Sequence, residues 1–246
     1  MSLTKNEIKF IRSLHQKKQR EVNNCFIIEG EKMINELYQQ SKFDIDILYY
    51  TDEYNSEKIS ESINKLLISN KELDRITGFK QANKVLAIVK TKKSLEPDYN
   101  ENNLILILDD VNDPGNLGTI LRTADWFGIT QIIVSKNTVD LYNPKVIQSS
   151  MGAIYRINYF IKDLKQEIEN LKFNNYQILG ATLSGENVYN MNFPVKSVLI
   201  MGSESHGLQK QMIDLLDSEI SIPNFGDSES LNVAMATGIL LSEFKR

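Results

Sequence analysis

The stretch Leu104-Ile-Leu-Ile-Leu108, followed by Asp109-Asp-Val-Asn-Asp-Pro-Gly-Asn-Leu-Gly-Thr-Ile-Leu-Arg122, decides the fold class of this chain. Its five consecutive apolar residues predict a strand buried on both faces, and the turn after them leads into a helix over residues 117–126. Further strand signatures lie at 131–135, 177–181, 198–201 and 219–222, and helical stretches at 163–171, 208–216 and 231–244. Because strands alternate with helices, we predict an α/β fold with a mostly parallel sheet and helices on both sides.

The N-terminal part predicts a second, smaller α/β unit. Helical patterns at 4–19 and 29–40 alternate with strand patterns at 25–28, 45–50 and 84–89. Between the two parts, the run LEPDYNENN from Leu95 to Asn103 is polar and turn-prone. We therefore predict one domain over residues 1–95, a linker over 96–103 and a second domain over 104–246.

The composition indicates a soluble globular protein in a reducing compartment. The chain has 246 residues, 41% of them hydrophobic and 24% charged, which is ordinary for that class. Cys25 is the only cysteine, the longest apolar runs are far too short to span a bilayer, and the N-terminus lacks the apolar core of a secretion signal. With His15 and His206 as the only histidines, a clustered zinc site would lack ligands. We expect a cytoplasmic location, no membrane and no metal.

Two basic stretches contrast with the net charge of −4. The first contains no acid, and its cations are Lys9, Arg12, Lys17, Lys18 and Arg20. The second holds Lys80, Lys84, Lys90, Lys92 and Lys93. Phosphate binding rewards such local positive charge, but most stretches of this kind are solvated faces. Charge alone leaves nucleic-acid binding and a plain protein surface both open.

The loop after the first buried strand is a candidate for chemistry, because ligands bind beyond the carboxyl ends of parallel strands. Asn116 is the predicted N-cap of the following helix, and Gly118 would let the backbone approach a ligand closely. Thr119, Arg122 and Asp125 share one face of that helix. A surface pair between Arg122 and Asp125 on an amphipathic helix would explain this loop without any function. The G-x-G-x-x-G spacing of dinucleotide-binding loops is absent.

Two later loops combine glycines with polar residues. Gly202-Ser-Glu-Ser-His-Gly207 follows a strand, and its glycines predict a tight turn against a ligand or another backbone segment. Glu204 in this turn could equally bond amides at a helix start. Ile222-Pro-Asn-Phe-Gly-Asp-Ser-Glu-Ser-Leu-Asn-Val233 precedes the last helix, for which Ser230 is the predicted N-cap. Taken singly, Ser230 and Asn232 are more often caps than catalysts.

Together the three loops resemble the motifs of the SpoU (TrmH-like) family of RNA 2′-O-ribose methyltransferases. The pattern N-x-G-x-x-x-R-x-A runs from Asn116 to Ala124, and G-x-E-x-x-G runs from Gly202 to Gly207. I-P followed by S-L-N-V is present at Ile222-Pro223 and Ser230–Val233. The ordered motifs cover the chain from about Leu104 to its end. Phe26-Ile-Ile-Glu-Gly30, after a basic helix, is similar to the family's N-terminal RNA-binding domain, although this match is shorter and less specific.

The resemblance implies a fold, a cofactor and partners that the residue pattern does not give. The fold is an α/β sheet whose C-terminal portion passes through a loop as a trefoil knot, preceded by a small α/β RNA-binding domain. The cofactor is S-adenosylmethionine, held by backbone groups around Thr182, Gly202, Ile222 and Leu231. The partners are a second copy of the chain, in contact with the last helix, and a structured RNA, with ribosomal RNA favoured over transfer RNA.

The resemblance also implies catalytic roles. Arg122 lies near the ribose 2′-hydroxyl. A guanidinium, with a pKa above about 12, is a poor proton acceptor, so our hypothesis is that it binds phosphate or stabilises the developing alkoxide. Asn116 and Ser230 or Asn232 orient the ribose and Arg122, and Glu204 holds the loops or Arg122. The first basic stretch, from Lys9 to Arg20, binds RNA.

Two departures from the family pattern concern the cofactor pocket. Ala234 stands where a serine is common, and Asn224 follows Pro223 where methionine is more usual.

Three alternatives remain at this point. A non-catalytic RNA-binding relative would keep the fold without using the cofactor, although the motif residues are retained. A methyltransferase of the same knotted class could act on a base nitrogen instead of the ribose. A small-molecule α/β enzyme would leave both basic stretches unexplained, and its substrate affinity would hardly depend on salt.

Overall fold

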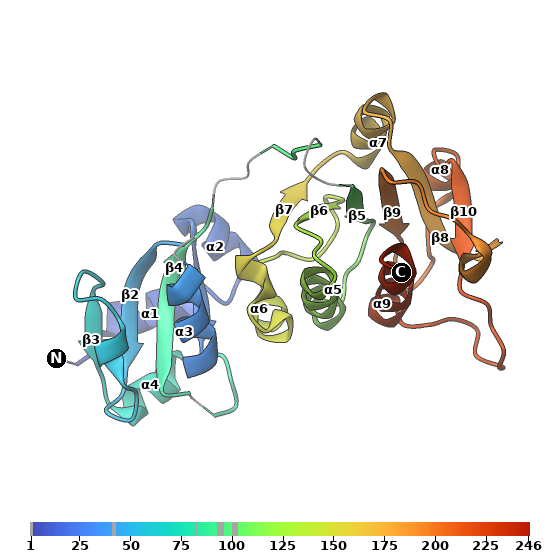
Figure 1. Ribbon diagram of the computed structural model, residues 1–246. Helices are drawn as coiled ribbons and strands as arrows, with labels where there is room; N and C mark the ends of the chain where they lie inside the picture. Colours follow the sequence, from blue (N-terminus) through green and yellow to red (C-terminus); the bar gives the residue numbers. More distant parts are fainter. Residues whose placement is uncertain (1, 41–42, 82, 93–95, 100–102) are drawn as a thin grey trace. The chain divides into compact units, whose positions relative to one another are not determined.

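The computed structural model describes residues 2–40, 43–81, 83–92, 96–99 and 103–246, which form two compact units (Figure 1). Unit 1 comprises Met1–Lys93 and Asp140–Tyr155, and unit 2 comprises Ser94–Val139 and Arg156–Arg246. The segment 140–155 packs with the N-terminal residues because Ile147 and Tyr155 join the hydrophobic core around Phe26. The domain boundaries predicted from the linker did not place residues 140–155 with the N-terminal part.

The sheet of unit 1 has the strand order β1-β4-β2-β3. The strands are β1 (Cys25–Glu29), β2 (Ile45–Tyr50), β3 (Lys65–Leu67) and β4 (Val85–Lys90), and the helices are α1 (Lys5–Ser13), α2 (Lys17–Asn23), α3 (Glu31–Gln40), α4 (Asn70–Ile76) and α6 (Pro144–Ser150), with the short 3₁₀ turns η1 (Ser56–Lys58) and η2 (Ala153–Tyr155). Alternate residues of β1 enter opposite cores: Phe26 and Ile28 pack with α3 and α6, whereas Cys25 and Ile27 pack with α1 and α4. The predicted small α/β unit is confirmed.

The single helix predicted over residues 4–19 is wrong, because the chain forms two helices there. The carbonyl oxygens of Leu14 and His15, between α1 and α2, each accept a hydrogen bond of 2.9 Å from Arg20 Nη1. Leu14 is also fully buried. A cation that satisfies the free carbonyls at the end of α1 stabilises a turn in place of a continuous helix.

The sheet of unit 2 has the order β10-β8-β9-β5-β6-β7, and all its pairs are parallel. The strands are β5 (Leu104–Leu108), β6 (Gln131–Val134), β7 (Asn158–Ile161), β8 (Gln177–Asn187), β9 (Ser197–Met201) and β10 (Ser218–Ser221), and the helices are α5 (Pro114–Trp126), α7 (Leu164–Phe173), α8 (Lys210–Ile213) and α9 (Val233–Phe244), with the 3₁₀ turn η3 (Val188–Asn190). The predicted parallel α/β sheet is confirmed. The sequence did not reveal the edge strand β7, of which only Phe160 is buried.

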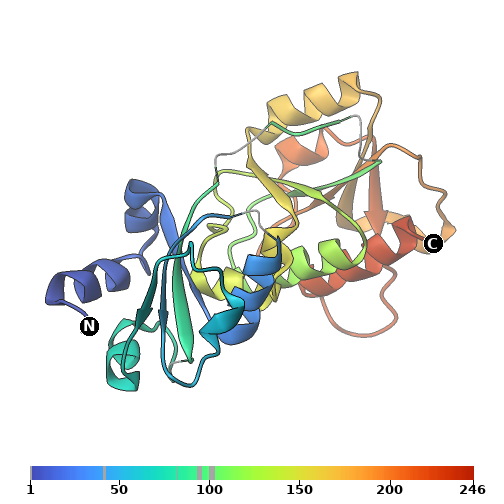
Figure 2. The same cartoon turned by 60° about the vertical axis from the view of Figure 1, so that its left-hand side comes forward.

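Helices cover both faces of this sheet. Ile105 and Ile107 of β5 pack into a core with α7, while α5 and α9 lie side by side on the other side of the sheet (Figures 1 and 2). Leu117, Leu121 and Ala124 of α5 are fully buried, as the amphipathic pattern predicted. None of the helices that the structure describes is long and apolar enough to cross a membrane.

The strand order reverses between β5 and β9. From β5 the chain continues to β6 and β7 on one side, whereas β9, β8 and β10 lie on the other. Leu108 and Met201 are register partners at the carboxyl ends of these two strands, and the backbone N–H of Asp109 donates to the Met201 carbonyl at 2.8 Å. Parallel sheets bind ligands at such a reversal, so the loops after β5 and β9 begin where a site is expected.

Candidate functional site

Asn116 joins the three loops that carry the sequence motifs. Its side-chain Nδ2 donates to Glu204 Oε1 at 3.0 Å, and its Oδ1 accepts from Asn232 Nδ2 at 2.9 Å. Glu204 belongs to the loop after β9, and Asn232 immediately precedes α9. The predicted convergence of the three loops therefore occurs, and an amide side chain forms its centre.

The predicted N-cap role of Asn116 is wrong. Asp113 caps α5: its Oδ1 accepts from the backbone N–H of Asn116 at 2.8 Å, and Pro114 occupies the first turn, where its missing N–H costs nothing. A cap three residues earlier leaves both polar atoms of the Asn116 side chain free to reach the other loops.

Asn232, and not Ser230, caps α9. Its Oδ1 accepts from the backbone N–H groups of Ala234 at 2.9 Å and Met235 at 3.3 Å, while its Nδ2 faces Asn116. One side chain thus starts the last helix and binds the first loop. Ser230 lies exposed, and no hydrogen bond joins it to these residues within the described part of the chain.

The loop after β9 is a closed turn. Ser203 and Gly207 exchange both backbone hydrogen bonds, at 3.1 and 2.9 Å, and Gly207 has a φ of +66°. A Cβ on Gly202 would lie 2.3 Å from the carbonyl carbon of Gly207, so only glycine fits there. Glu204 Oε2 also accepts from the Asn112 backbone N–H at 3.5 Å. Of the roles considered for Glu204, the structure therefore favours holding the loops together over capping a nearby helix or holding Arg122.

Arg122 lies on the exposed face of α5. The surface pair with Asp125 does not form, because Asp125 binds Arg156, with nitrogen–oxygen distances between 2.8 and 3.0 Å. Among the residues that the structure describes, none makes a hydrogen bond or ion pair with the Arg122 guanidinium. It shares α5 with Asn116 and is free to meet an anion.

Three of the four residues predicted to hold the cofactor lie in or directly after neighbouring strands. Gly202 follows β9, Ile222 follows β10, and Thr182 lies in β8, the strand between them. Glu219 of β10 pairs with Gly180 of β8, and the next residue, Ile220, pairs with Glu186. Thr182 therefore lies in a segment of β8 that does not pair with β10. The fourth predicted residue, Leu231, lies in the loop before α9 and is 51% exposed.

Groups at three of these positions suit a nucleoside cofactor. Thr182 Oγ1 is buried and lacks a hydrogen-bond partner among the described residues, and a ligand polar group would satisfy it. Leu231 offers apolar area, and the closed turn that follows Gly202 fixes the backbone there. The residues present therefore fit the implied group.

The basic residues predicted to bind RNA divide into two kinds. Lys9, Arg12, Lys17 and Lys18 are exposed, whereas Arg20 is only 3% exposed and pairs with Asp140 at 2.5 Å. Arg20 is thus a structural residue, and its assignment to RNA is corrected. In the second stretch Lys80, Lys84, Lys90 and Lys92 are exposed, and Lys93 lies outside the described residues.

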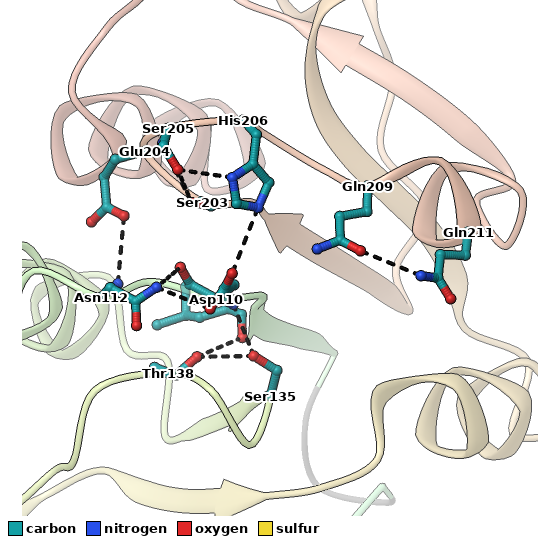
Figure 3. Close-up of polar contacts among 11 residues, drawn as sticks. Asp110, Asn112, Ser135, Thr138, Ser203, Glu204, Ser205, His206, Gln209 and Gln211 are labelled. Carbon is teal, nitrogen blue, oxygen red and sulfur yellow. Dashed lines mark hydrogen bonds and ion pairs between the residues drawn. The ribbon is translucent and has the colours of Figure 1, made fainter.

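Sequence reasoning missed a polar cluster at the strand reversal, which involves Asp110, Asn112, Ser135 and His206 (Figure 3). The neighbouring Asp109 also interacts with Ser135, Asp110 and His206. Burial raises the pKa of the Asp109 carboxyl above its usual range, against the lowering effect of a hydrogen bond with Ser135. Two successive acids directly after a buried strand were the available signal. No group of three or more His, Cys, Asp or Glu suited to a metal ion occurs in the described ranges.

Comparisons with known proteins give two domain matches and several relatives. The SpoU rRNA Methylase family matches residues 103–242, and the MRM3-like substrate binding domain matches residues 5–87. The chain is 28% identical to the 23S rRNA (guanosine(2553)-2′-O)-methyltransferase RlmP of Bacillus subtilis, over 98% of this chain and 96% of that protein. It is 32% identical to the 23S rRNA (guanosine-2′-O-)-methyltransferase RlmB of Neisseria meningitidis, over 91% of each. The S-adenosylmethionine-bound rRNA methyltransferase of Sinorhizobium meliloti has a similar structure, with a TM-score of 0.87, 28% identity, and coverage of 99% of this chain and 96% of that one.

Proposed function

Because the chain belongs to the SpoU rRNA methylase family, we propose that it transfers a methyl group from S-adenosylmethionine to a ribose 2′-hydroxyl in ribosomal RNA. The observation that carries the proposal is the meeting of the three motif loops at Asn116, between Glu204 and Asn232. RlmP and RlmB are named as 23S rRNA 2′-O-methyltransferases, which supports ribosomal RNA as the substrate class. We place the reaction in the cytoplasm, where that substrate is found.

The cofactor residues in this proposal are Thr182, Gly202, Ile222 and Leu231. S-adenosylmethionine supplies a methyl group that its sulfonium already activates, so the protein has mainly to position the acceptor and ease loss of the hydroxyl proton. The Thr182 hydroxyl, which has no hydrogen-bond partner among the described residues, and the backbone of the closed turn after Gly202 are suited to the polar groups of a nucleoside. The exposed side chain of Leu231 is suited to its apolar surface.

Arg122 acts on the acceptor in this proposal. Its guanidinium is exposed and has no ion pair among the described residues, so it is available to a phosphate or to the oxygen on which charge develops. The 2′-hydroxyl proton goes to solvent or a neighbouring group, since a guanidinium holds its own proton.

Glu204, Asn116 and Asn232 orient the acceptor in this proposal. The Glu204 carboxylate can only accept, so it keeps Nδ2 of Asn116 toward the loop after β9 and Oδ1 toward Asn232. Ser230, exposed on the same loop as Asn232, is available to the ribose.

We further propose that a second copy of the chain covers the groove between α5 and α9. Thr119 and Thr123 of α5 line this open groove of about 440 Å³ together with Met235 and Gly238 of α9. Met235 is 62% exposed, which favours an apolar partner. Sedimentation should show a dimer, and M235D should shift it toward the monomer. A wild-type monomer at micromolar concentration contradicts this assembly.

The trefoil knot implied by the family resemblance stays a prediction.

The reaction is tested with 23S rRNA from cells that lack the gene, methyl-labelled S-adenosylmethionine and the purified chain. We expect label in a 2′-O-methylnucleoside after complete digestion, and R122A should abolish it. Label in a methylated base instead identifies the base-nitrogen alternative. A folded protein that binds no S-adenosylmethionine in calorimetry identifies the non-catalytic alternative.

A further inference from the structure

Beside Asn116, a second set of contacts joins the loop after β5 to the loop after β9 (Figure 3). His206 Nε2 lies 3.6 Å from Asp110 Oδ2, and His206 Nδ1 lies 2.8 Å from Ser205 Oγ. Both ring nitrogens therefore have partners, which fixes the orientation of the imidazole. The roles proposed for Arg122 and Asn116 do not involve either residue of this pair.

The backbone of Asp110 is held in an unusual conformation. Its φ of +59° lies in the left-handed region, which few residues other than glycine adopt. Its N–H donates to Ser135 Oγ at 2.8 Å, and Asn112 Nδ2 donates to its carbonyl at 3.1 Å and to its Oδ1 at 2.9 Å. Surroundings that maintain such a conformation often serve a site, and here they direct the Asp110 carboxylate toward His206 (Figure 3).

The loop after β9 transmits the position of His206 to Glu204. Both residues lie between Ser203 and Gly207, whose paired backbone hydrogen bonds close the loop. Glu204 accepts from the backbone N–H of Asn112, and the side chain of Asn112 binds Asp110. The contacts thus form a ring through both loops, and Glu204 reaches Asn116 from this ring.

The contact between His206 and Asp110 matters because the two loops carry several carboxyl groups. Asp109, Asp110 and Glu204 bring three carboxyl groups to the two loops. Besides burial, the charge of Asp110 raises the pKa of Asp109, whereas His206 lowers it. Among the described residues in contact with Asp110, His206 is the only one able to carry a positive charge. A protonated imidazole at this position would offset repulsion among the carboxylates of the two loops.

We propose that Asp110 and His206 are positioning residues of the methyl transfer, which hold the loop after β9 against the loop after β5 so that Glu204 stays on Asn116. This inference rests on the proposed function, because Asn116 orients the acceptor only if the chain methylates ribose.

The kinetic test uses D110N, H206Q, H206R and the double variant D110N/H206Q in the full chain. Asparagine tolerates the left-handed backbone and its oxygen can still accept from Asn112, so D110N removes the charge and replaces the oxygen that faces His206 with an N–H donor. We expect D110N and H206Q each to lower the single-turnover methylation rate of 23S rRNA about tenfold, since misplacement of about 1 Å can cost about 100-fold. H206R places a permanent cation opposite Asp110 and should stay within about threefold of wild type. E169Q, an exposed acid on α7, is the control and should leave the rate unchanged.

Two results separate positioning from a general structural role. The double variant should be no slower than the slower single variant, because both substitutions break one interaction. Affinity for S-adenosylmethionine in calorimetry should stay within about twofold of wild type, because positioning of the acceptor leaves cofactor binding intact. Wild-type rates for both single variants, multiplied losses in the double variant, or a parallel loss of cofactor affinity would each overturn the proposal.

The contact itself can be tested without RNA or cofactor. The chain has two histidines, so proton NMR gives two Cε1–H resonances, and H206Q identifies that of His206. D110N should shift the His206 resonance and leave the His15 resonance in place. An unshifted His206 resonance overturns the inference. A shifted resonance in a wild-type chain that methylates no ribosomal RNA contradicts the proposed function instead and leaves the loop contact standing.

Discussion

Arg122 and Arg20 show that two arginines of one chain can have opposite uses. Arg122 is exposed and makes no ion pair among the described residues, whereas Arg20 is 3% exposed and bonds Asp140 and two backbone carbonyls. A basic residue in the sequence is therefore a candidate for RNA only if its partners within the fold leave it free.

R122K retains the positive charge of Arg122 and removes its planar fork of donors. We expect the methylation rate of 23S rRNA to fall about 100-fold, as when one transition-state donor is lost from other enzymes. Affinity for S-adenosylmethionine in calorimetry should not change, because Arg122 is placed on the acceptor. Near-normal turnover by R122K would show that charge alone suffices and that the fork has no role.

R20A removes the buried partner of Asp140 in unit 1. We expect the free energy of unfolding to fall by about 3 kcal/mol, because a partly buried carboxylate and two carbonyls lose their donor. Urea denaturation measures this loss. K18A changes an exposed cation two residues away and should cost less than about 0.5 kcal/mol. Equal stability of R20A and K18A would return Arg20 to the set of surface residues.

The start of α9 has two tasks that one substitution can separate. Asn232 caps the helix with Oδ1 and binds Asn116 with Nδ2. N232D keeps a good capping oxygen but replaces the N–H group that donates to Asn116 with an acceptor. If the Asn116 amide rotated to donate to the new carboxylate, it could no longer donate to Glu204. We expect a loss of about three- to tenfold in methylation rate, equivalent to one hydrogen bond. The free energy of unfolding should stay within about 0.5 kcal/mol of wild type.

N232A is the matched variant, because it removes both interactions. It should lose the same activity and, in addition, about 1 kcal/mol of stability from the missing cap. Wild-type activity in N232D would mean that the contact with Asn116 does not serve the reaction, whatever happens to N232A.

Elements with a clear period could be predicted from the sequence, and those set by distant contacts could not. The five apolar residues of β5 and the buried stripe of α5 were evident because burial leaves a local pattern. The break between α1 and α2 was not, because it depends on Arg20 reaching back to Leu14 and His15. The segment of β8 that contains Thr182 is unpaired with β10, and this depends on how two strands far apart in the sequence align. A short stretch of sequence therefore could not predict it.

The candidate site followed the same rule. Asn116, Glu204 and Asn232 were singled out because three motifs in order carry them, and in the structure Asn116 bonds both of the others. The cap assignments of Asn116 and Ser230 were wrong because a better cap stood two or three residues away, at Asp113 and Asn232. The pair of Asp110 and His206 has no motif and becomes visible only when both loops are in place.

At the scale of the whole molecule, the proposed function assigns RNA binding to exposed cations of unit 1 and cofactor binding to unit 2. The motif residues all belong to unit 2, whereas the exposed cations of α1 and α2 belong to unit 1, where the MRM3-like substrate binding domain matches. The net charge of −4 does not reveal the exposed cations of unit 1. Phosphate binding depends on such local charge and not on the total. RNA affinity and cofactor affinity should therefore respond to different substitutions.

The variant K17A/K18A tests that division. Lys17 and Lys18 are exposed, and the only ion pair described for either is the 3.9 Å pair of Lys17 with exposed Glu21, which contributes little to stability. We expect weaker binding of 23S rRNA and a salt dependence whose logarithmic slope falls by roughly 1 for each phosphate that the variant no longer neutralises. S-adenosylmethionine affinity should be unchanged, because its residues lie in unit 2. K165A, an exposed lysine on α7, provides a control of equal chemistry. If K17A/K18A and K165A bind RNA equally well across the salt range, α2 does not contact the phosphates, and the basic stretch is a solvated face.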